Sequence, residues 1–180
     1  MPQAAAHILI PLLILSLIRD FYVSRKGKKK FPLHYVLIGG IAGIIPDLDI
    51  VAYWFLNFFG FTLNQIHRTS FHSIYIPIIF LLLGFITYNV RISELGRHKL
   101  KLHIIFYLLA FGSLVHLILD ATLAGYIIPF YPLSNFAVGL NLFGLLPISL
   151  QSLAAPSLDA GLLIIYLIYL EWKHKISDFI

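Results

Sequence analysis

Two pairs of polar side chains stand inside otherwise apolar stretches, at spacings that suit metal coordination. His116 and Asp120 are four residues apart, so on a helix both side chains would lie on one face, about 5–6 Å from each other. Asp47 and Asp49 are two residues apart in the motif Pro-Asp-Leu-Asp, which presents carboxylate oxygens to a hard or borderline cation. Both pairs are therefore candidate ligands of a divalent metal ion.

Three more histidines and one arginine extend the set. His67 and His72 lie in a polar connection, and His7 is close to the start of the sequence. Imidazole and carboxylate in a chain without cysteine favour zinc, with manganese or iron as alternatives. Seven candidate ligands exceed the three of a usual catalytic zinc site and point towards two ions, as in phosphoester hydrolysis. Arg68 could bind an anionic group through a bidentate contact.

Each of these motifs also has a simpler explanation when it is taken alone. The His116 and Asp120 pair could be a buried hydrogen bond, and the Pro-Asp-Leu-Asp motif could be a helix cap and turn. His7, His67 and His72 could be ordinary interfacial residues. The joint occurrence of all these groups favours a metal site or a proton relay. The remaining histidines are interpreted as ordinary residues of the basic loops: His34, His98, His103 and His174.

The composition indicates which elements must position these groups. Hydrophobic residues make up 59 % of the chain and charged residues 12 %, and the mean hydropathy is +0.89, whereas ordinary soluble domains carry about 25 % charged residues. This excludes a typical soluble protein and, despite a net charge of +5, a nucleic-acid-binding one. The expected fold is all-α, a single domain of residues 1–180 forming a polytopic membrane bundle of about five transmembrane helices with broken or re-entrant segments.

The expected spans follow from the apolar stretches. They cover roughly residues 4–23, 33–61 with a break at 46–49, 74–90, 102–123 and 158–172. The small residues of Ile-Gly-Gly-Ile-Ala-Gly, before the break, allow neighbouring helices to approach closely. Glycines and prolines punctuate the segment 127–150, for which a re-entrant path is one interpretation.

The positive-inside rule sorts the polar groups between the two membrane faces. When the basic cluster after the first span is cytoplasmic, alternation brings 12 of the 13 lysines and arginines to that side. Arg68 alone lies on the other. His7, His67, His72, His116 and the three aspartates fall with Arg68, although histidine and aspartate were not used to set the topology. We therefore expect one polar cluster at the extracytoplasmic face.

The order of these motifs resembles the YdjM-type family of inner-membrane metal-dependent hydrolases. The resemblance rests on an early His7, Pro-Asp-Leu-Asp at 46–49, His-Arg-Thr-Ser-Phe-His-Ser at 67–73 and Val-His-Leu-Ile-Leu-Asp followed by Gly and Pro at 115–129. It covers residues 7–132. Thr69 and Phe71 depart from the family pattern, which has Gly and Thr there. The resemblance implies an integral protein of the inner (cytoplasmic) membrane and metal-dependent hydrolysis.

Together these observations predict a metal-dependent hydrolase that cleaves a phosphoester or acyl bond of a lipid-like or phosphorylated small-molecule substrate at the extracytoplasmic interface, with membrane lipids as surroundings. The expected ligands are His7, Asp47, Asp49, His67, His72, His116 and Asp120. Asp49 or Asp120 would act as base or orient the nucleophilic water, and Arg68 would bind the anionic group. A transporter or proton-translocating protein, and a non-catalytic protein with a structural metal, remain alternatives.

Overall fold

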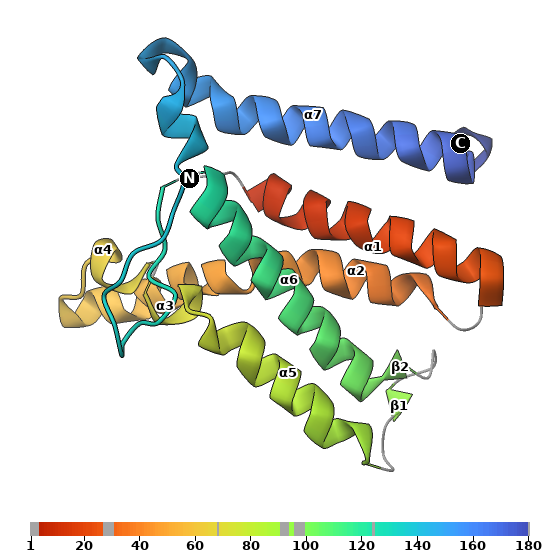
Figure 1. The fold of residues 1–180 in the computed structure, drawn as a ribbon, viewed down its shortest axis with the longest axis horizontal. Helices are drawn as coiled ribbons and strands as arrows, with labels where there is room; N and C mark the ends of the chain where they lie inside the picture. Colours follow the sequence, from red (N-terminus) through yellow and green to blue (C-terminus); the bar gives the residue numbers. More distant parts are fainter. Residues whose placement is uncertain are drawn as a thin grey trace.

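The computed structural model describes residues 4–26, 31–67, 69–90, 94–95, 100–123 and 125–179. These residues are mostly helical (Figure 1). The helices of eight or more residues are α1 (Ala4–Lys26), α2 (Leu33–Ile41), α3 (Asp49–Leu56), α5 (Tyr75–Tyr88), α6 (Leu102–Leu123) and α7 (Ile148–His174). Shorter helical turns are η2 (Ala42–Ile44), η3 (Pro46–Leu48), η4 (Asn57–Phe59), α4 (Leu63–Ile66), η5 (Ser70–His72), η6 (Leu142–Leu145) and η7 (Ile176–Phe179). The two-residue strands β1 (Glu94–Leu95) and β2 (Leu100–Lys101) pair antiparallel. The expected all-α membrane bundle is confirmed.

Three of the helices, α1, α6 and α7, are long and apolar enough to cross a membrane. The segments Leu33–Ile44 and Pro46–Phe59 pass the same test together but are bent by 51° at their junction, so they make a broken fourth span. Helix α5 has 14 residues, a length of about 21 Å at 1.5 Å per residue, which is short of the hydrocarbon thickness of about 30 Å. The expected five spans are thus three full spans, one broken span and one short apolar helix.

Close helix approach depends on the small residues around the break. A Cβ at Gly43 of η2 would overlap the backbone carbonyl of His7 in α1, and a Cβ at Gly112 of α6 would overlap Ala42. Glycine removes these clashes, so α1, η2 and α6 meet at backbone distance. This confirms the packing role expected for the Ile-Gly-Gly-Ile-Ala-Gly sequence.

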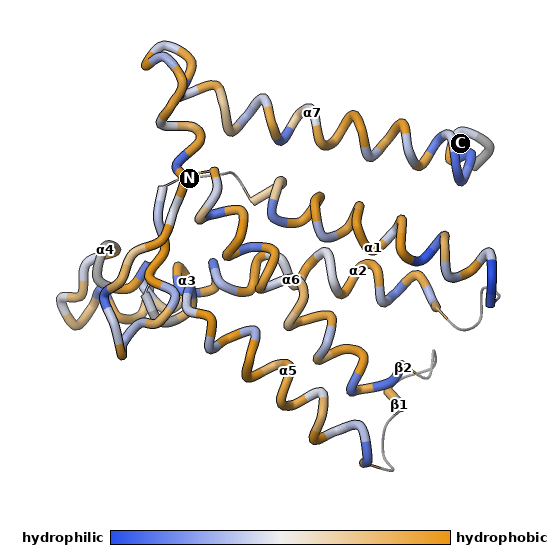
Figure 2. Tube along the Cα trace, viewed as in Figure 1, coloured by the Kyte–Doolittle hydropathy of each residue, from blue (hydrophilic) through white to orange (hydrophobic). Residues whose placement is uncertain are grey.

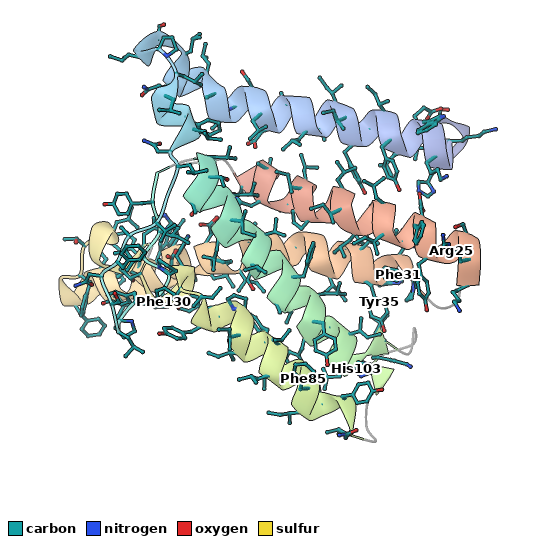
Figure 3. The ribbon with its side chains drawn as sticks, in the orientation of Figure 1. Arg25, Phe31, Tyr35, Phe85, His103 and Phe130 are labelled. Carbon is teal, nitrogen blue, oxygen red and sulfur yellow. The ribbon has the colours of Figure 1, made fainter. Side chains whose placement is uncertain are left out.

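The two ends of the bundle differ in character (Figure 2). One end, which we call the basic end, holds the end of α1 at Lys26 and the end of α7 at His174. There the Tyr35 hydroxyl accepts a hydrogen bond from the Lys101 backbone N–H at 2.7 Å, and the Phe31 ring meets the Tyr35 ring edge-on (Figure 3). The other end, which we call the histidine end, holds the beginning of α1 and the last turns of α6.

The final span is longer than the apolar pattern predicts. Helix α7 begins at Ile148, ten residues before the expected start at Leu158, with Pro156 accommodated inside it. The preceding residues 125–147 form turns, an isolated bridge between Ile127 and Val138 and the short η6, and a re-entrant path for this segment stays a prediction. The Pro129 carbonyl accepts a hydrogen bond from the Ile74 N–H at 2.8 Å, which anchors this segment at the start of α5.

Candidate metal centre

The two aspartates of the Pro-Asp-Leu-Asp motif lie where the broken span bends. Pro46 is the first residue of η3, and proline cannot supply the backbone N–H that a continuing helix would need. Asp47 follows it, and Asp49 is the first residue of α3. The N-cap residues of η3 and α3 are Ile45 and Leu48, and neither makes a side-chain cap hydrogen bond. The cap interpretation of this motif therefore lacks support.

Helix α6 delivers His116 and Asp120 to the same place, on one face of its last turns. His116 is fully buried and Asp120 is 3 % exposed. The Nδ1–H of His116 donates to the Gly43 carbonyl at 2.6 Å. A carbonyl can only accept, so this contact fixes the orientation of the ring and directs Nε2 into the cluster, which is the usual arrangement of a metal-binding histidine. Nε2 faces Asp120 Oδ2 at 3.6 Å.

The polar connection before α5 brings in His72 and His67. His72 is fully buried, and its Nε2 lies 3.2 Å from His116 Nε2 and 3.4 Å from Asp120 Oδ2. Its Nδ1 lies on the opposite side, 3.1 Å from Asp49 Oδ2. His67 donates from Nδ1 to the same carboxylate at 3.0 Å. Asp49 therefore contacts two imidazole rings on their Nδ1 sides.

Helix α1 contributes His7, whose ring lies against that of His116 with centroids 3.9 Å apart. His7 is 1 % exposed, and its Nε2 is 3.4 Å from Asp120 Oδ1. Among the described residues neither ring nitrogen of His7 makes a hydrogen bond, and the same holds for Nε2 of His67. Buried polar atoms are nearly always satisfied, so these nitrogens fit a site that binds a cation.

Two carboxylates bridge the histidines of this cluster. Asp120 directs Oδ1 to His7 and Oδ2 to both His72 and His116. Asp47 Oδ1 lies 3.6 Å from His72 Nε2 and 3.7 Å from His116 Nε2. Among the described residues, three groups have ligand atoms close enough to hold an ion: His7, Asp47 and His116; Asp47, His67 and His72; His72, His116 and Asp120. Because Asp47 belongs to the first two groups, it suits a bridging position between two ions.

The electrostatics of His72 follow from its neighbours. Burial lowers the pKa of its imidazole, but the carboxylates of Asp120, Asp47 and Asp49 outweigh burial and raise that pKa to about 10. In the metal-free protein His72 is therefore protonated at neutral pH. A divalent cation would replace this proton, since a ligating imidazole must be neutral.

The structure brings six of the seven expected ligands into the three groups, and Asp49 is the exception. Its position against the Nδ1 atoms of His67 and His72 favours an orienting role behind the ligands, and its coordination of a metal stays a prediction. Arg68, expected to bind the anionic group, lies outside the described residues. The chemistry of the donor set, imidazole and carboxylate without thiolate, fits zinc, manganese or iron.

One residue at the histidine end was not expected from the sequence. Asp159 of α7 is 7 % exposed, and its Oδ1 accepts a hydrogen bond from the Ala6 N–H at 2.9 Å, one residue before His7. The aspartate thus caps the start of α1 from a helix 153 positions away. The sequence could have indicated a role for Asp159, because it is a lone carboxylate within the last apolar stretch. Such groups face protein or polar surroundings rather than lipid.

Comparison with known proteins agrees with this geometry. No curated protein and no solved structure matches the chain. The sequence model of one family, described as YdjM inner membrane protein, matches residues 1–175. That match covers every residue of the metal cluster and all the membrane-spanning helices. The chain therefore belongs to the YdjM family of inner membrane proteins.

Proposed function

We propose that this protein is a membrane-bound metal-dependent hydrolase whose centre acts on a phosphoester or acyl bond of a lipid-like substrate at the extracytoplasmic interface. The observation that carries the proposal is the cluster of four imidazoles and three carboxylates, drawn from α1, the helix break, the connection before α5 and α6. A bound divalent cation would supply Lewis acidity and an activated water. The protein's own part is to hold the ligands, orient them and admit the substrate.

Part of the cluster is exposed. The Asp47 side chain is 27 % exposed, whereas those of His72 and His116 are fully buried. A structural metal site is closed by its ligands, and a catalytic one keeps an open position. The exposed edge at Asp47 therefore favours catalysis over a purely structural metal.

The surroundings of the cluster support a substrate from the membrane. Trp54 of α3 and Phe58 and Phe59 of η4 are 70 %, 87 % and 79 % exposed, and Leu133 in the segment after α6 is 81 % exposed. Aromatic side chains concentrate at membrane–water interfaces, and large exposed apolar surfaces mark sites of membrane or ligand contact. A lipid-like substrate fits this environment, because its phosphoester or acyl bond would lie at headgroup depth with its apolar chains beside these side chains.

The roles of individual residues follow from their contacts. Asp120 faces three histidines with its two oxygens, so it would position the ion and with it the attacking water. Asp49 would orient His67 and His72, and Asp47 at the open edge would lie next to the substrate. On this assignment Asp120→Asn removes a ligand, whereas Asp49→Asn weakens metal binding by loosening the rings behind it.

The test combines metal analysis of the purified protein with hydrolysis of model phosphoesters and phospholipids in mixed micelles. We expect bound metal, metal-dependent turnover in the wild type, and loss of at least a hundredfold in turnover for Asp120→Asn. Glu171→Gln, a carboxylate-to-amide change at the basic end, is the matched control. Bound metal without metal-dependent turnover on any of these substrates would reject the hydrolase and favour a structural metal or a transporter.

A further inference from the structure

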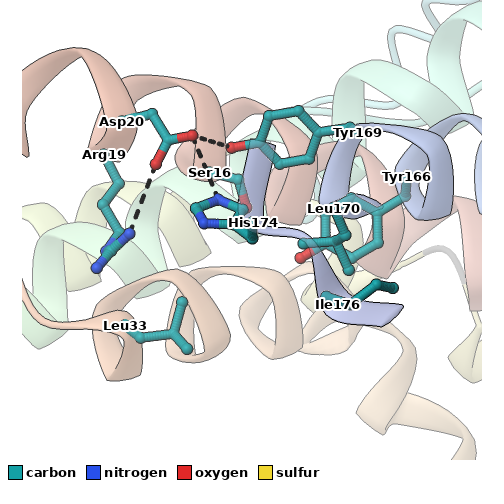
Figure 4. A pocket seen from close by; sticks show the side chains of 9 residues that line it. All are labelled: Ser16, Arg19, Asp20, Leu33, Tyr166, Tyr169, Leu170, His174 and Ile176. Atoms are coloured by element: carbon teal, nitrogen blue, oxygen red, sulfur yellow. Dashed lines mark hydrogen bonds and ion pairs between the residues drawn. The ribbon is translucent and has the colours of Figure 1, made fainter. Parts of the chain in front are cut away.

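A second polar site lies at the opposite end of the bundle from the metal cluster. A cavity of about 250 Å³ opens between α1, α2 and α7. Its lining comes from Ser16, Arg19, Asp20, Leu33, Tyr166, Tyr169, Leu170, His174 and Ile176 (Figure 4). His7 precedes Arg19 by 12 positions on α1, so about 18 Å of helix separates the two sites.

The carboxylate of Asp20 is the hub of this cavity. Its Oδ2 accepts a hydrogen bond from the Tyr169 hydroxyl at 2.6 Å and lies 3.3 Å from His174 Nε2. Its Oδ1 lies 3.5 Å from Arg19 NH1. Both oxygens are thus engaged, so Asp20 is poorly placed to receive a cationic ligand group, and its negative charge is offset within the cavity.

Arg19 keeps donor capacity after these contacts. A guanidinium has five N–H donors, and Arg19 uses Nε on the Phe31 carbonyl at 3.1 Å and NH1 towards Asp20. The Arg19 side chain is 15 % exposed. Its burial by neighbouring groups restricts its movement and leaves it partly desolvated. Guanidinium groups in such surroundings bind phosphate oxygens by paired hydrogen bonds.

The charges around the cavity favour an anion. Arg25 and Lys26 end α1, and Lys173 and Lys175 stand at the end of α7, all exposed. The Glu171 carboxylate accepts hydrogen bonds from the Ser177 backbone N–H at 3.0 Å and from the Ser177 hydroxyl at 2.6 Å. Basic pockets between transmembrane helices on the cytoplasmic side are known to bind anionic headgroups. The basic end is the cytoplasmic one under the positive-inside rule.

The size and flank of the cavity indicate what kind of anion it takes. Pockets that enclose a drug-sized ligand span about 300–1,000 Å³, so this smaller cavity suits a headgroup and not a whole lipid. Beside it, Leu33, Leu37 and Ile41 repeat every fourth residue along α2 and are 57 %, 49 % and 59 % exposed. This apolar row runs from the cavity along the helix, where acyl chains would lie.

We propose that this cavity binds the phosphodiester headgroup of an anionic phospholipid of the cytoplasmic leaflet. Arg19 contacts the phosphate, and the acyl chains follow the row of apolar side chains on α2. The lipid would bridge α1, α2 and α7 at an end where Tyr169 and His174 of α7 contact Asp20 of α1. The inference is independent of the proposed hydrolase, because it uses none of the residues of the metal cluster.

The test uses delipidated full-length protein in detergent and measures binding by native mass spectrometry and thermal unfolding. The probes are dioleoyl phosphatidylglycerol, dioleoyl phosphatidylcholine, sn-glycerol 3-phosphate and inorganic phosphate. For the wild type we expect the anionic lipid to bind at least tenfold more tightly than the zwitterionic one and to raise the unfolding midpoint. We expect the two soluble phosphates to bind at least tenfold more weakly than the anionic lipid.

Variants then separate the cavity from general surface charge. Arg19→Gln should lower the affinity for phosphatidylglycerol at least tenfold, whereas Arg25→Gln, the same change on an exposed residue of the same helix, should lower it less than threefold. Equal losses in both variants, or no preference for the anionic lipid in the wild type, would overturn the proposal. Binding of free phosphate as tight as that of the lipid would replace it with a soluble-anion site. The wild-type comparison stands even where a variant fails to fold.

Discussion

Replacing Gly43 by alanine should weaken metal binding at the candidate centre without changing any candidate ligand. The added Cβ would overlap the His7 carbonyl, so α1 and η2 must move apart. Overpacking of this kind costs about 1–3 kcal/mol. The same movement displaces the Gly43 carbonyl, which accepts the 2.6 Å hydrogen bond from His116 Nδ1. Two candidate ligands, His7 and His116, are therefore disturbed by one methyl group.

The size of the effect can be estimated from the hydrogen bond behind His116. Loss of a partner behind a metal ligand typically weakens metal binding 10- to 100-fold, or about 1.4–2.7 kcal/mol. The assay is competitive titration with a chromophoric zinc chelator, followed by metal analysis after dialysis. Gly161→Ala is the matched control, because a Cβ there meets nothing within 4 Å and alanine is a better helix former than glycine. Wild-type affinity in Gly43→Ala would show that the carbonyl does not orient His116.

Three further results follow from the same geometry. Chelation with EDTA should lower the midpoint of thermal unfolding, because an ion present at 100 times its dissociation constant stabilises the folded state by about 2.7 kcal/mol. Added zinc should restore the midpoint, and a midpoint that EDTA leaves unchanged would count against a bound ion. Because the neighbouring carboxylates raise the pKa of His72 to about 10, metal binding at neutral pH should release a proton, and the affinity should increase as pH rises towards that value. Calorimetry in buffers of different ionisation enthalpy measures the proton release. An affinity independent of pH would contradict a protonated His72. Asp159→Ala should destabilise the protein by about 1 kcal/mol through loss of the cap on Ala6, while Asp159→Asn keeps the acceptor and most of the stability in unfolding assays; equal losses would show that the charge, and not the hydrogen bond, matters.

The convergence of the cluster at one end of the bundle could be predicted from the sequence, because the distribution of lysine and arginine and the positions of the histidines and aspartates agree. The lysines and arginines predict a topology that brings His7, His67 and His116 to one membrane face. Side chains at one end of a bundle of so few helices must lie close together, because its cross-section is small. The spacing of His116 and Asp120 on α6 likewise predicts their shared face.

The finer arrangement depends on contacts that a sequence does not encode locally. Nothing in the spacing of Asp47 and Asp49 indicates that one lies near Nε2 atoms and the other near Nδ1 atoms, because that depends on the 51° bend and the path before α5. Asp159 was missed because its partner, the Ala6 N–H, is a backbone group. His174 looked like an ordinary loop histidine, yet the packing of α7 on α1 brings it to Asp20.

Charge balance argues for two ions in the centre. The cluster contains three buried or partly buried carboxylates and four histidines, and net charge is costly at a membrane interface. One divalent ion leaves a charge of −1, which, among the described residues of the cluster, only a protonated imidazole such as His72 could offset, and that would remove His72 from the candidate ligands. Two ions leave +1, which a single anionic group of a substrate neutralises. Metal analysis should therefore give two ions per chain with His72 deprotonated, and one ion per chain without proton release on binding would refute this count.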